Sequence, residues 1–387
     1  MANSRNKILL VIPGLTAGGA ERVLVLLTEG LLAQGYGVDV VTVFGRQHDF
    51  YPLPKGVQRI ALDLGGDTSR VVDKLAGNLR RITGLRRAIR AAAPDVVISF
   101  LSETNVLVLL ATVGLGIPVI VTEHIDSRCY PLGRAWKTLR RLSYRRAARL
   151  VSASAGIDMG FSWLPAGRRV VIHNPVCLDG SDAAVSAPRR FPRPHTVLAM
   201  GRLETQKGFD LLIDAFGRLA ADFPDWGLVI LGEGSLRPKL SAQIEALGLG
   251  DRIHMPGVTA SPAATLRRGD LFVLSSRYEG FGLALVEAMA VGLPVVAADC
   301  PSGPAEIVHP GEDGLLVPAE NVSALAGAMA QLMSDPAERR RLGENARAVA
   351  QRFGLNTVMQ SWEQVIDACL GQGRAFLSSG IRTRRSP

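Results

Sequence analysis

Features typical of metalloenzymes and of disulfide-rich secreted proteins are scarce in this 387-residue chain. The four cysteines lie far apart and form no Cys-x-x-Cys pair, so neither a zinc site nor a disulfide framework is predicted. No Asp-x-Asp occurs, and His and Cys do not cluster, so we expect no metal and no other cofactor. Aromatic residues make up only 5%, which argues against stacking on single-stranded nucleic acid.

A signal peptide and a membrane span are also not predicted. The first apolar run, Ile8–Pro13, is short and meets a glycine turn, so we interpret it as a buried strand. The uncharged stretch Thr104–Thr122 is long enough to cross a bilayer, but Gly114, Gly116 and Pro118 interrupt it, which favours a helix followed by a strand. Free thiols fit a reducing compartment, so we expect a cytoplasmic protein.

Charge is distributed unevenly along the chain. The net charge is +9, and residues 1–190 hold 25 Lys and Arg against 14 Asp and Glu, whereas the remainder holds 19 against 21. A basic half attracts phosphorylated ligands, anionic lipid or nucleic acid. The hydrophobic content of 47% is enough for a core in each half, and the length suggests two domains.

Apolar strands alternate with helical stretches in both halves, which predicts an α/β fold with parallel sheets. We predict two doubly wound Rossmann-like domains that face each other across a cleft. The predicted N-terminal domain spans 1–177, with a helix near 356–370 packing back on it; 178–194 is a linker, 195–355 the C-terminal domain and 371–387 a flexible basic tail.

The segment 14–22 reads GLTAGGAER and joins the first predicted strand to a helix. Its glycines, Gly18 and Gly19 among them, allow backbone N–H groups and a helix N-terminus to approach a phosphate. The segment matches neither Gly-x-Gly-x-x-Gly nor a P-loop. A tight strand-to-helix turn explains it equally well.

The segment 201–208, GRLETQKG, occupies the corresponding place in the second half, directly after a predicted strand. Arg202 offers a bidentate fork and Lys207 a point charge, a suitable pair for a diphosphate. The alternative is a solvated loop with surface cations.

The segment 279–287, EGFGLALVE, follows another predicted strand and turns into a helix at its glycines. Glu287 lies in the second turn of that otherwise apolar helix, where a buried carboxylate needs a partner. A ribose diol could supply it, and so could an arginine.

Two further turns follow strands. His124 could hydrogen-bond a sugar hydroxyl or transfer a proton, although a loop histidine is often structural. The turn 301–306, PSGPAE, adds small groups and Glu306 to the same predicted rim, or is simply a rigid helix start.

Together the GGAER turn, the GRL…QKG loop and the Glu-x7-Glu segment resemble the family 4 retaining glycosyltransferases of the GT-B fold, in order and over nearly the whole chain. The likeness extends to bacterial members that assemble surface polysaccharides or glycans on polyprenyl-diphosphate carriers. It implies a metal-independent enzyme that moves a sugar from a nucleotide-sugar donor, with UDP-sugars favoured over GDP-sugars, to a glycan or lipid-linked acceptor.

The resemblance also implies roles for individual residues. The diphosphate would be held by Arg202 and Lys207, the ribose by Glu287 and the transferred sugar by Glu279. Catalysis would rest on His124, Glu279, Arg202 and Lys207. The remaining donor-binding residues would be Gly18, Gly19, Val258, Phe281, Gly282 and Leu283, with Val258 placed beside the base.

The acceptor side of this family is the N-terminal domain. The basic stretch 133–150 is amphipathic and suits an anionic membrane surface, so we expect peripheral association with the inner face of the plasma membrane; a solvated helix face is the alternative. A nucleotide-sugar epimerase would leave the Arg202–Lys207 loop and the Glu-x7-Glu segment unexplained. A nucleic-acid-binding protein is suggested only by a pI near 9.8, and we expect no nucleic-acid partner.

Overall fold

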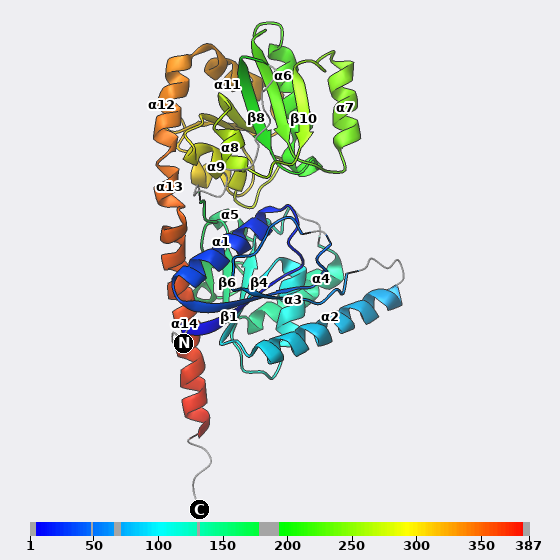
Figure 1. The fold of residues 1–387 in the computed structure, drawn as a ribbon, viewed down its shortest axis with the longest axis vertical. Coiled ribbons are helices and arrows are strands. Elements are labelled where there is room, and N and C mark those ends of the chain that lie inside the picture. The colour runs from blue at the N-terminus through cyan, green and yellow to red at the C-terminus, as the bar shows by residue number, and fades with distance from the viewer. Residues whose placement is uncertain (1–4, 48, 66–70, 130–131, 178–192, 382–387) are drawn as a thin grey trace, which may run out of the picture. The chain divides into compact units, whose positions relative to one another are not determined.

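In a computed structural model the chain divides into two compact units (Figure 1). Unit 1 comprises Met1–Pro175 together with Leu355–Pro387, and unit 2 comprises Val176–Gly354. The structure describes all residues except 1–4, 48, 66–70, 130–131, 178–192 and 382–387. The predicted linker lies almost entirely outside the described residues.

Unit 1 is built on a parallel sheet of seven strands in the order β3-β2-β1-β4-β5-β6-β7. The interior strand β1 carries the apolar run that the sequence marks, and all five residues from Ile8 to Ile12 are inaccessible to solvent. The strands are β1 Arg5–Ile12, β2 Tyr36–Thr42, β3 Gln58–Ala61, β4 Val96–Phe100, β5 Val119–Glu123, β6 Arg149–Ser152 and β7 Arg169–Val171.

Helices in unit 1 cover the sheet in separate groups. Helix α1 packs with α14, which returns from the far end of the sequence, whereas α3 packs with both α2 and α4 (Figure 1). The helices are α1 Gly19–Ala33, α2 Val71–Ala92, α3 Ser102–Ala111, α4 Arg134–Ser143, α5 Ala155–Met159 and α14 Leu355–Ile381, with short 3-10 turns at Tyr144–Arg146 and Ala166–Arg168.

Unit 2 repeats the design with a six-stranded parallel sheet in the order β10-β9-β8-β11-β12-β13. Its core lies between the sheet and helices α6 and α11, where Phe216, Ile230 and Met329 are fully buried. The strands are β8 His195–Met200, β9 Trp226–Leu231, β10 Ile253–Gly257, β11 Leu271–Leu274, β12 Val295–Asp299 and β13 Leu315–Pro318. The helices are α6 Phe209–Leu219, α7 Arg237–Ala246, α8 Pro262–Leu266, α9 Leu283–Ala290, α10 Pro304–Ile307, α11 Val322–Ser334, α12 Pro336–Ala346 and α13 Val349–Arg352.

The two parallel sheets confirm the predicted α/β class, while details differ. Strands β3 and β7 were not predicted, because they are short, partly exposed edge strands without a continuous apolar run. The amphipathic stretch over 133–150 contains α4, a 3-10 turn and the start of β6.

Residues 371–381 of the predicted flexible tail continue helix α14, while 382–387 lie outside the described residues, so the flexibility of the tail stays a prediction. A started helix gains one hydrogen bond for each added residue, and no proline interrupts 355–381. The uncharged stretch considered as a membrane span forms α3 and β5. No helix within the described parts of the chain is long and apolar enough to cross a membrane.

Candidate active site

The first predicted turn lies at the topological switch point of unit 1, where β1 and β4 are neighbours and the strand order runs outward on both sides. Open parallel sheets bind ligands at such points, beyond the carboxyl ends of the strands. Gly18 precedes α1 and Gly19 begins it. A methyl group at Gly18 would overlap the Glu21 carboxylate, whereas a methyl group at Gly19 would meet no protein atom within 4 Å. Space beside Gly19 is therefore open to a ligand.

His124 directly follows β5 in the same unit. Its ring stacks on Phe100 with 5.4 Å between centroids, and its Nε2 atom lies 3.0 Å from Thr122 Oγ1. Burial lowers the pKa of His124 to about 4. The imidazole is consequently neutral near pH 7 and can exchange hydrogen bonds there, but it is a weak base for proton transfer.

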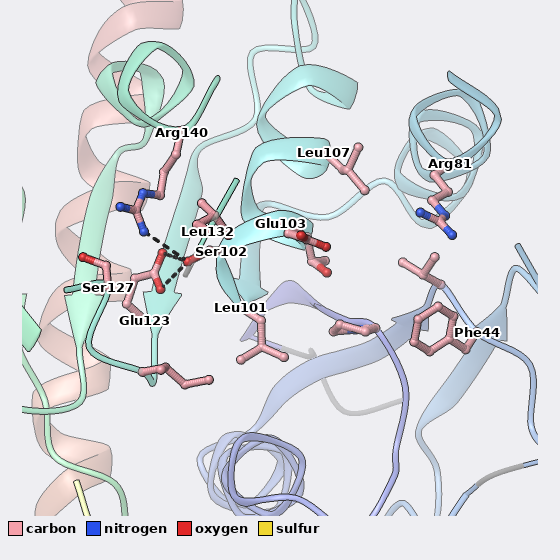
Figure 2. A pocket seen from close by; sticks show the side chains of 14 residues that line it. Phe44, Arg81, Leu101, Ser102, Glu103, Leu107, Glu123, Ser127, Leu132 and Arg140 are labelled. Carbon is pink, nitrogen blue, oxygen red and sulfur yellow. Dashed lines mark hydrogen bonds between the residues drawn. The ribbon is translucent and has the colours of Figure 1, made fainter. Parts of the chain in front are cut away.

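A cavity also opens at this edge of the sheet, between the ends of β1, β4 and β5 (Figure 2). At one side of it Ser102 donates hydrogen bonds to both oxygens of Glu123, at 2.9 and 2.8 Å. None of the donor-binding residues predicted from the sequence lines this cavity.

The predicted Arg202–Lys207 loop occupies the equivalent switch point of unit 2. It follows β8, and the Glu279 loop follows the neighbouring strand β11. Gly208 closes the first loop at φ 60°, where a side chain would overlap the Ser275 carbonyl oxygen. Ser275 Oγ in turn donates to the Lys207 carbonyl at 2.9 Å. The Ser275 side chain thereby ties the second loop to the backbone of the first.

Lys207 and Glu279, 72 residues apart in sequence, form an ion pair. Lys207 Nζ lies 2.6 Å from Glu279 Oε1, and their side chains are 15% and 6% exposed. Ser276 Oγ donates to the same oxygen at 2.6 Å. The Lys207 stem passes over Gly201, where an added methyl group would come within 3.1 Å of three of its carbons. The glycine thus leaves room for the lysine to reach its partner.

Arg202 is exposed on the same loop. Its guanidinium donates to Gln206 Oε1 at 3.2 Å, and Gln206 donates from Nε2 to the Tyr278 carbonyl at 3.1 Å. This chain of contacts links the arginine to the loop that carries Glu279. Most of the donor capacity of Arg202 remains available to an anion, because a guanidinium carries five N–H groups.

Helix α9 begins where the Glu279 loop ends. Gly282 precedes it at φ 102°, so its conformation favours glycine, and Leu283 is its first residue. Phe281 is 2% exposed and packs edge-on against Phe353. Glu287 lies in the second turn and is only 4% exposed. An eight-residue helix with a glycine before it presents N–H groups and a partial positive charge at its start.

Val258 lies apart from this cluster in sequence, one residue beyond β10. It is 47% exposed, one of the few large apolar side chains on the surface of unit 2. The turn over 301–306 contacts the Glu279 loop directly, since the Glu279 N–H donates to the Pro301 carbonyl at 3.2 Å.

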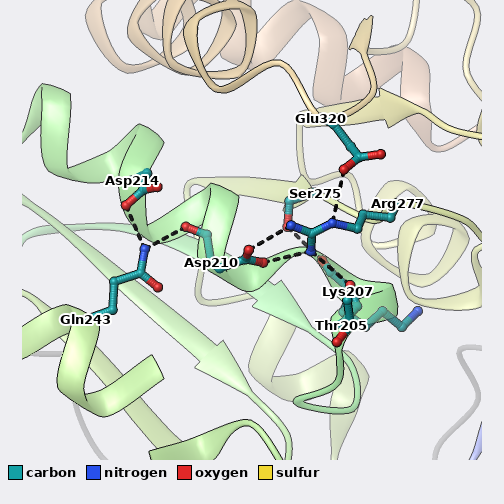
Figure 3. Close-up of polar contacts among 8 residues, drawn as sticks. All are labelled: Thr205, Lys207, Asp210, Asp214, Gln243, Ser275, Arg277 and Glu320. Carbon is teal, nitrogen blue, oxygen red and sulfur yellow. Dashed lines mark hydrogen bonds and ion pairs between the residues drawn. The ribbon is translucent and has the colours of Figure 1, made fainter. Parts of the chain in front are cut away.

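Sequence reasoning missed Arg277, which connects the loop after β11 to the loop after β8 (Figure 3). Its guanidinium forms a bidentate pair with Asp210 at 2.8 and 2.7 Å, and donates to the Thr205 carbonyl at 2.9 Å and to Glu320 at 3.2 Å. The Arg277 N–H also donates to the Gln206 carbonyl at 2.8 Å. The side-chain hydrogen bonds from the Arg277 guanidinium lower the pKa of Asp210. The only sequence signal was an arginine two residues before Glu279.

The structure thus places Arg202 and Lys207 on the loop after β8, and Glu279 on the loop between β11 and α9, in unit 2, while Gly18, Gly19 and His124 belong to unit 1. Among the described residues, no group of three or more His, Cys, Asp or Glu side chains could hold a metal ion.

Comparison with known protein families shows to which family the chain belongs. Residues 18–175 match the model of the glycosyl transferase 4-like domain, and residues 183–349 match the model of glycosyl transferases group 1. The chain belongs to the family 4 glycosyltransferases. The second match contains the Arg202–Lys207 loop and the Glu279–Glu287 segment.

Individual relatives agree with this assignment. The chain is 27% identical over 362 residues, 93% of its length and 98% of the relative's, to a Campylobacter jejuni α-1,4-N-acetyl-D-galactosaminyltransferase whose name specifies a diphosphate-undecaprenol-linked glycan. Its fold matches that of sucrose-phosphate synthase from Thermosynechococcus elongatus (TM-score 0.81, 23% identity, 95% and 100% of the chains). It also matches Anabaena Alr3699/HepE, solved with UDP and glucose (TM-score 0.76, 22% identity, 94% and 100%). The glycosyltransferase therefore has the GT-B fold, with two Rossmann-like domains.

Proposed function

We propose that this glycosyltransferase transfers a sugar, with retention at the anomeric carbon, from a nucleotide-sugar donor to a glycan or polyprenyl-diphosphate-linked acceptor in bacterial surface glycan assembly. UDP-sugars are the favoured donors, because a structural neighbour was solved with UDP. The lipid-linked acceptor is favoured by the undecaprenol-linked substrate in the name of the Campylobacter relative.

The observation that carries the proposal is the Lys207–Glu279 pair beside Arg202 at the switch point of unit 2. A diphosphate needs cations, and Arg202 and Lys207 are held on one loop by the Arg277 contacts. The start of α9 adds N–H donors from the adjacent loop. The site therefore has an anion-binding side and a carboxylate side, as a nucleotide sugar requires.

Each remaining donor contact has a place in this scheme. Gly18 and Gly19 bring the α1 backbone to the diphosphate, and open space beside Gly19 allows that approach. Glu287 binds the ribose hydroxyls, and Val258 packs against the base with its exposed side chain. The backbone around Phe281, Gly282 and Leu283 meets the phosphate or the sugar.

The chemistry depends on stabilising the leaving diphosphate rather than on a strong side-chain nucleophile. Negative charge grows on the phosphate oxygen as its bond to the anomeric carbon breaks, and Arg202 and Lys207 neutralise it. Glu279 contacts the transferred sugar while its Oε1 atom fixes Lys207. Neutral His124 exchanges hydrogen bonds with the sugar instead of acting as a general base, in keeping with its lowered pKa. No metal is required in this scheme.

A donor screen tests this function. The full chain is incubated with UDP- and GDP-sugars, with and without EDTA, and donor hydrolysis or transfer is scored; the anomeric configuration of any product is read by NMR. We expect a UDP-sugar to be consumed equally in EDTA, and Arg202→Ala to lower turnover on the order of 10²-fold. Arg340→Ala, an exposed arginine on α12, is the matched control. Equal turnover in Arg202→Ala and Arg340→Ala would overturn the assignment.

We also propose peripheral binding to anionic membranes through α4. Leu139 and Leu142 are 40% and 60% exposed there, and Lys137 and Arg141 are exposed beside them. Apolar side chains among cations suit the headgroup region of an anionic bilayer. In vesicle flotation we expect wild type to bind phosphatidylglycerol vesicles in a salt-sensitive way, and Lys137→Glu/Arg141→Glu to release it. Binding that is unchanged by this double charge reversal would refute the proposal.

A further inference from the structure

The cavity in unit 1 lies beyond the ends of β1, β4 and β5, at the switch point where a doubly wound sheet holds ligands (Figure 2). It encloses about 190 Å³, below the ~300–1,000 Å³ of sites that enclose a drug-sized ligand, so its size suits a single ring. Its lining includes Phe44, Ser102, Glu103, Glu123, Ser127 and Arg140.

The polar side of the cavity is a buried carboxylate network. Glu123 is 2% exposed and accepts hydrogen bonds from Ser102 and from the Tyr144 hydroxyl. The Ser102 hydroxyl shares its one hydrogen between Oε1 and Oε2, Tyr144 donates to Oε1, and the Asn105 side chain also hydrogen-bonds to the carboxylate. A carboxylate has about four acceptor sites, so three donors leave capacity for a hydroxyl group of a ligand.

The guanidinium of Arg140 lies against this network and is aimed toward Ser102 (Figure 2). It is 8% exposed, and it lies 5.1 Å from the centre of the Phe161 ring, which holds it in place. A buried donor and a buried acceptor therefore face the same cavity. Neighbouring hydroxyl groups on a sugar, each able to donate and accept, match such a pair.

The backbone is strained at the same place. Leu101 has φ 71° and ψ 139°, a conformation that a leucine rarely adopts, and it leads directly into Ser102 at the start of α3. Strain of this kind persists at ligand sites, where the fold over-determines a position. Here it sets the direction in which Ser102 enters the cavity.

Charge and polarity define the ligand class. The lining holds two carboxylates, Glu103 and Glu123, and two guanidinium groups, Arg81 and Arg140, so the cavity has no excess of positive charge for a diphosphate. Leucine side chains form much of the remaining cavity wall, and Phe44, which also lines the cavity, is 41% exposed. A pyranose has an apolar C–H face and a rim of hydroxyl groups, which fits apolar walls with a polar side.

We propose that this cavity binds one uncharged sugar ring of the acceptor, with Glu123 Oε2 accepting a hydroxyl hydrogen and Arg140 donating to a neighbouring oxygen. The inference rests on the proposed transfer function and specifies which part of the acceptor the first unit recognises. The anionic part of a lipid-linked acceptor binds elsewhere.

The test uses methyl glycosides as probes for the sugar ring. Methyl glycosides of glucose, galactose, mannose, N-acetylglucosamine and N-acetylgalactosamine are added to the full chain with saturating UDP, and binding is measured by saturation-transfer NMR. Two variants alter the cavity: Ser127→Trp fills it from a half-buried loop position, and Glu123→Gln removes the charge while keeping the shape. Ser162→Trp, at an exposed position of unit 1 outside the cavity, is the matched control.

We expect at least one glycoside to bind wild type and Ser162→Trp, to be lost from Ser127→Trp, and to bind Glu123→Gln on the order of tenfold more weakly. Inorganic pyrophosphate should not displace it. Binding of no glycoside, equal binding to Ser127→Trp, or displacement by pyrophosphate would overturn the assignment. The affinity for UDP is measured for wild type and for every variant. If wild type does not bind UDP, the proposed function itself is contradicted. If UDP binds but no glycoside does, only the assignment of this cavity to an acceptor sugar is contradicted.

Discussion

Replacing Lys207 by methionine tests whether that lysine serves the donor or merely its buried partner. Lys207→Met removes a cation from the diphosphate and also leaves Glu279, which is 5% exposed, with one fewer donor. A charge-assisted hydrogen bond contributes about 1.5–3 kcal/mol, so we expect UDP to bind roughly 10- to 150-fold more weakly. Breaking a buried ion pair costs about 3–5 kcal/mol, so the melting temperature should fall as well.

The two effects are separated by adding Glu279→Gln. An amide in place of the carboxylate needs no counter-charge, so the double variant should recover melting temperature relative to Lys207→Met. It should not recover affinity for UDP. Glu279→Gln alone frees the lysine, so its affinity for UDP should equal or exceed that of wild type.

Calorimetric titration with UDP and thermal unfolding of the four proteins complete a double-mutant cycle. Ser276 is present in all four proteins, so that one hydroxyl donor to position 279 is constant. Recovery of near-wild-type UDP affinity in the double variant would refute the reasoning, because Lys207 would then act only by neutralising Glu279.

Three further outcomes are expected. Gly19→Ala should fold normally, since its methyl group meets no protein atom within 4 Å, yet raise the KM for the donor; an unchanged KM in steady-state assays would exclude close backbone approach. Arg277→Lys, which loses the bidentate contact with Asp210, should lower kcat/KM on the order of 10- to 100-fold by displacing the Lys207 loop, and turnover equal to wild type would deny it a positioning role. The folded-state pKa of His124, about 4, lies below its ordinary 6.5, so this residue contributes stability above pH 6.5 that is lost as the pH falls to 4. His124→Gln should abolish that loss, which is at most about 3 kcal/mol in the free energy of unfolding measured with denaturant. Identical pH profiles for the variant and wild type would contradict the burial of the ring.

The fold was predictable because its strands are continuous apolar runs. A parallel sheet covered on both faces buries entire strands, as in Ile8–Ile12. The edge strands β3 and β7 could not be predicted, since they are held by pairing with a neighbour and not by burial of their own side chains.

The site was predictable only in part, and the reason is topological. Parallel strands deliver their following loops to one edge, so charged residues after neighbouring strands, such as Lys207 and Glu279, are expected to lie near each other. Strand order does not, however, reveal which charged side chains form a pair. The Glu123 network was missed for this reason: its donors come from α3 and from the turn after α4, and no local pattern brings them together.

Arg277 shows what such hidden contacts contribute to function. Its partner Asp210 lies 67 residues away, at the start of α6, directly after the loop that carries Lys207. The same guanidinium also donates to the Thr205 carbonyl inside that loop, so one side chain contacts both the end and the middle of the segment that we propose to bind the diphosphate. A flexible loop would have to be ordered by the donor at an entropic cost, and these contacts reduce that cost. In the proposed mechanism the two cations are thereby directed at charge that develops only as the glycosidic bond breaks, which is where electrostatic stabilisation accelerates the reaction.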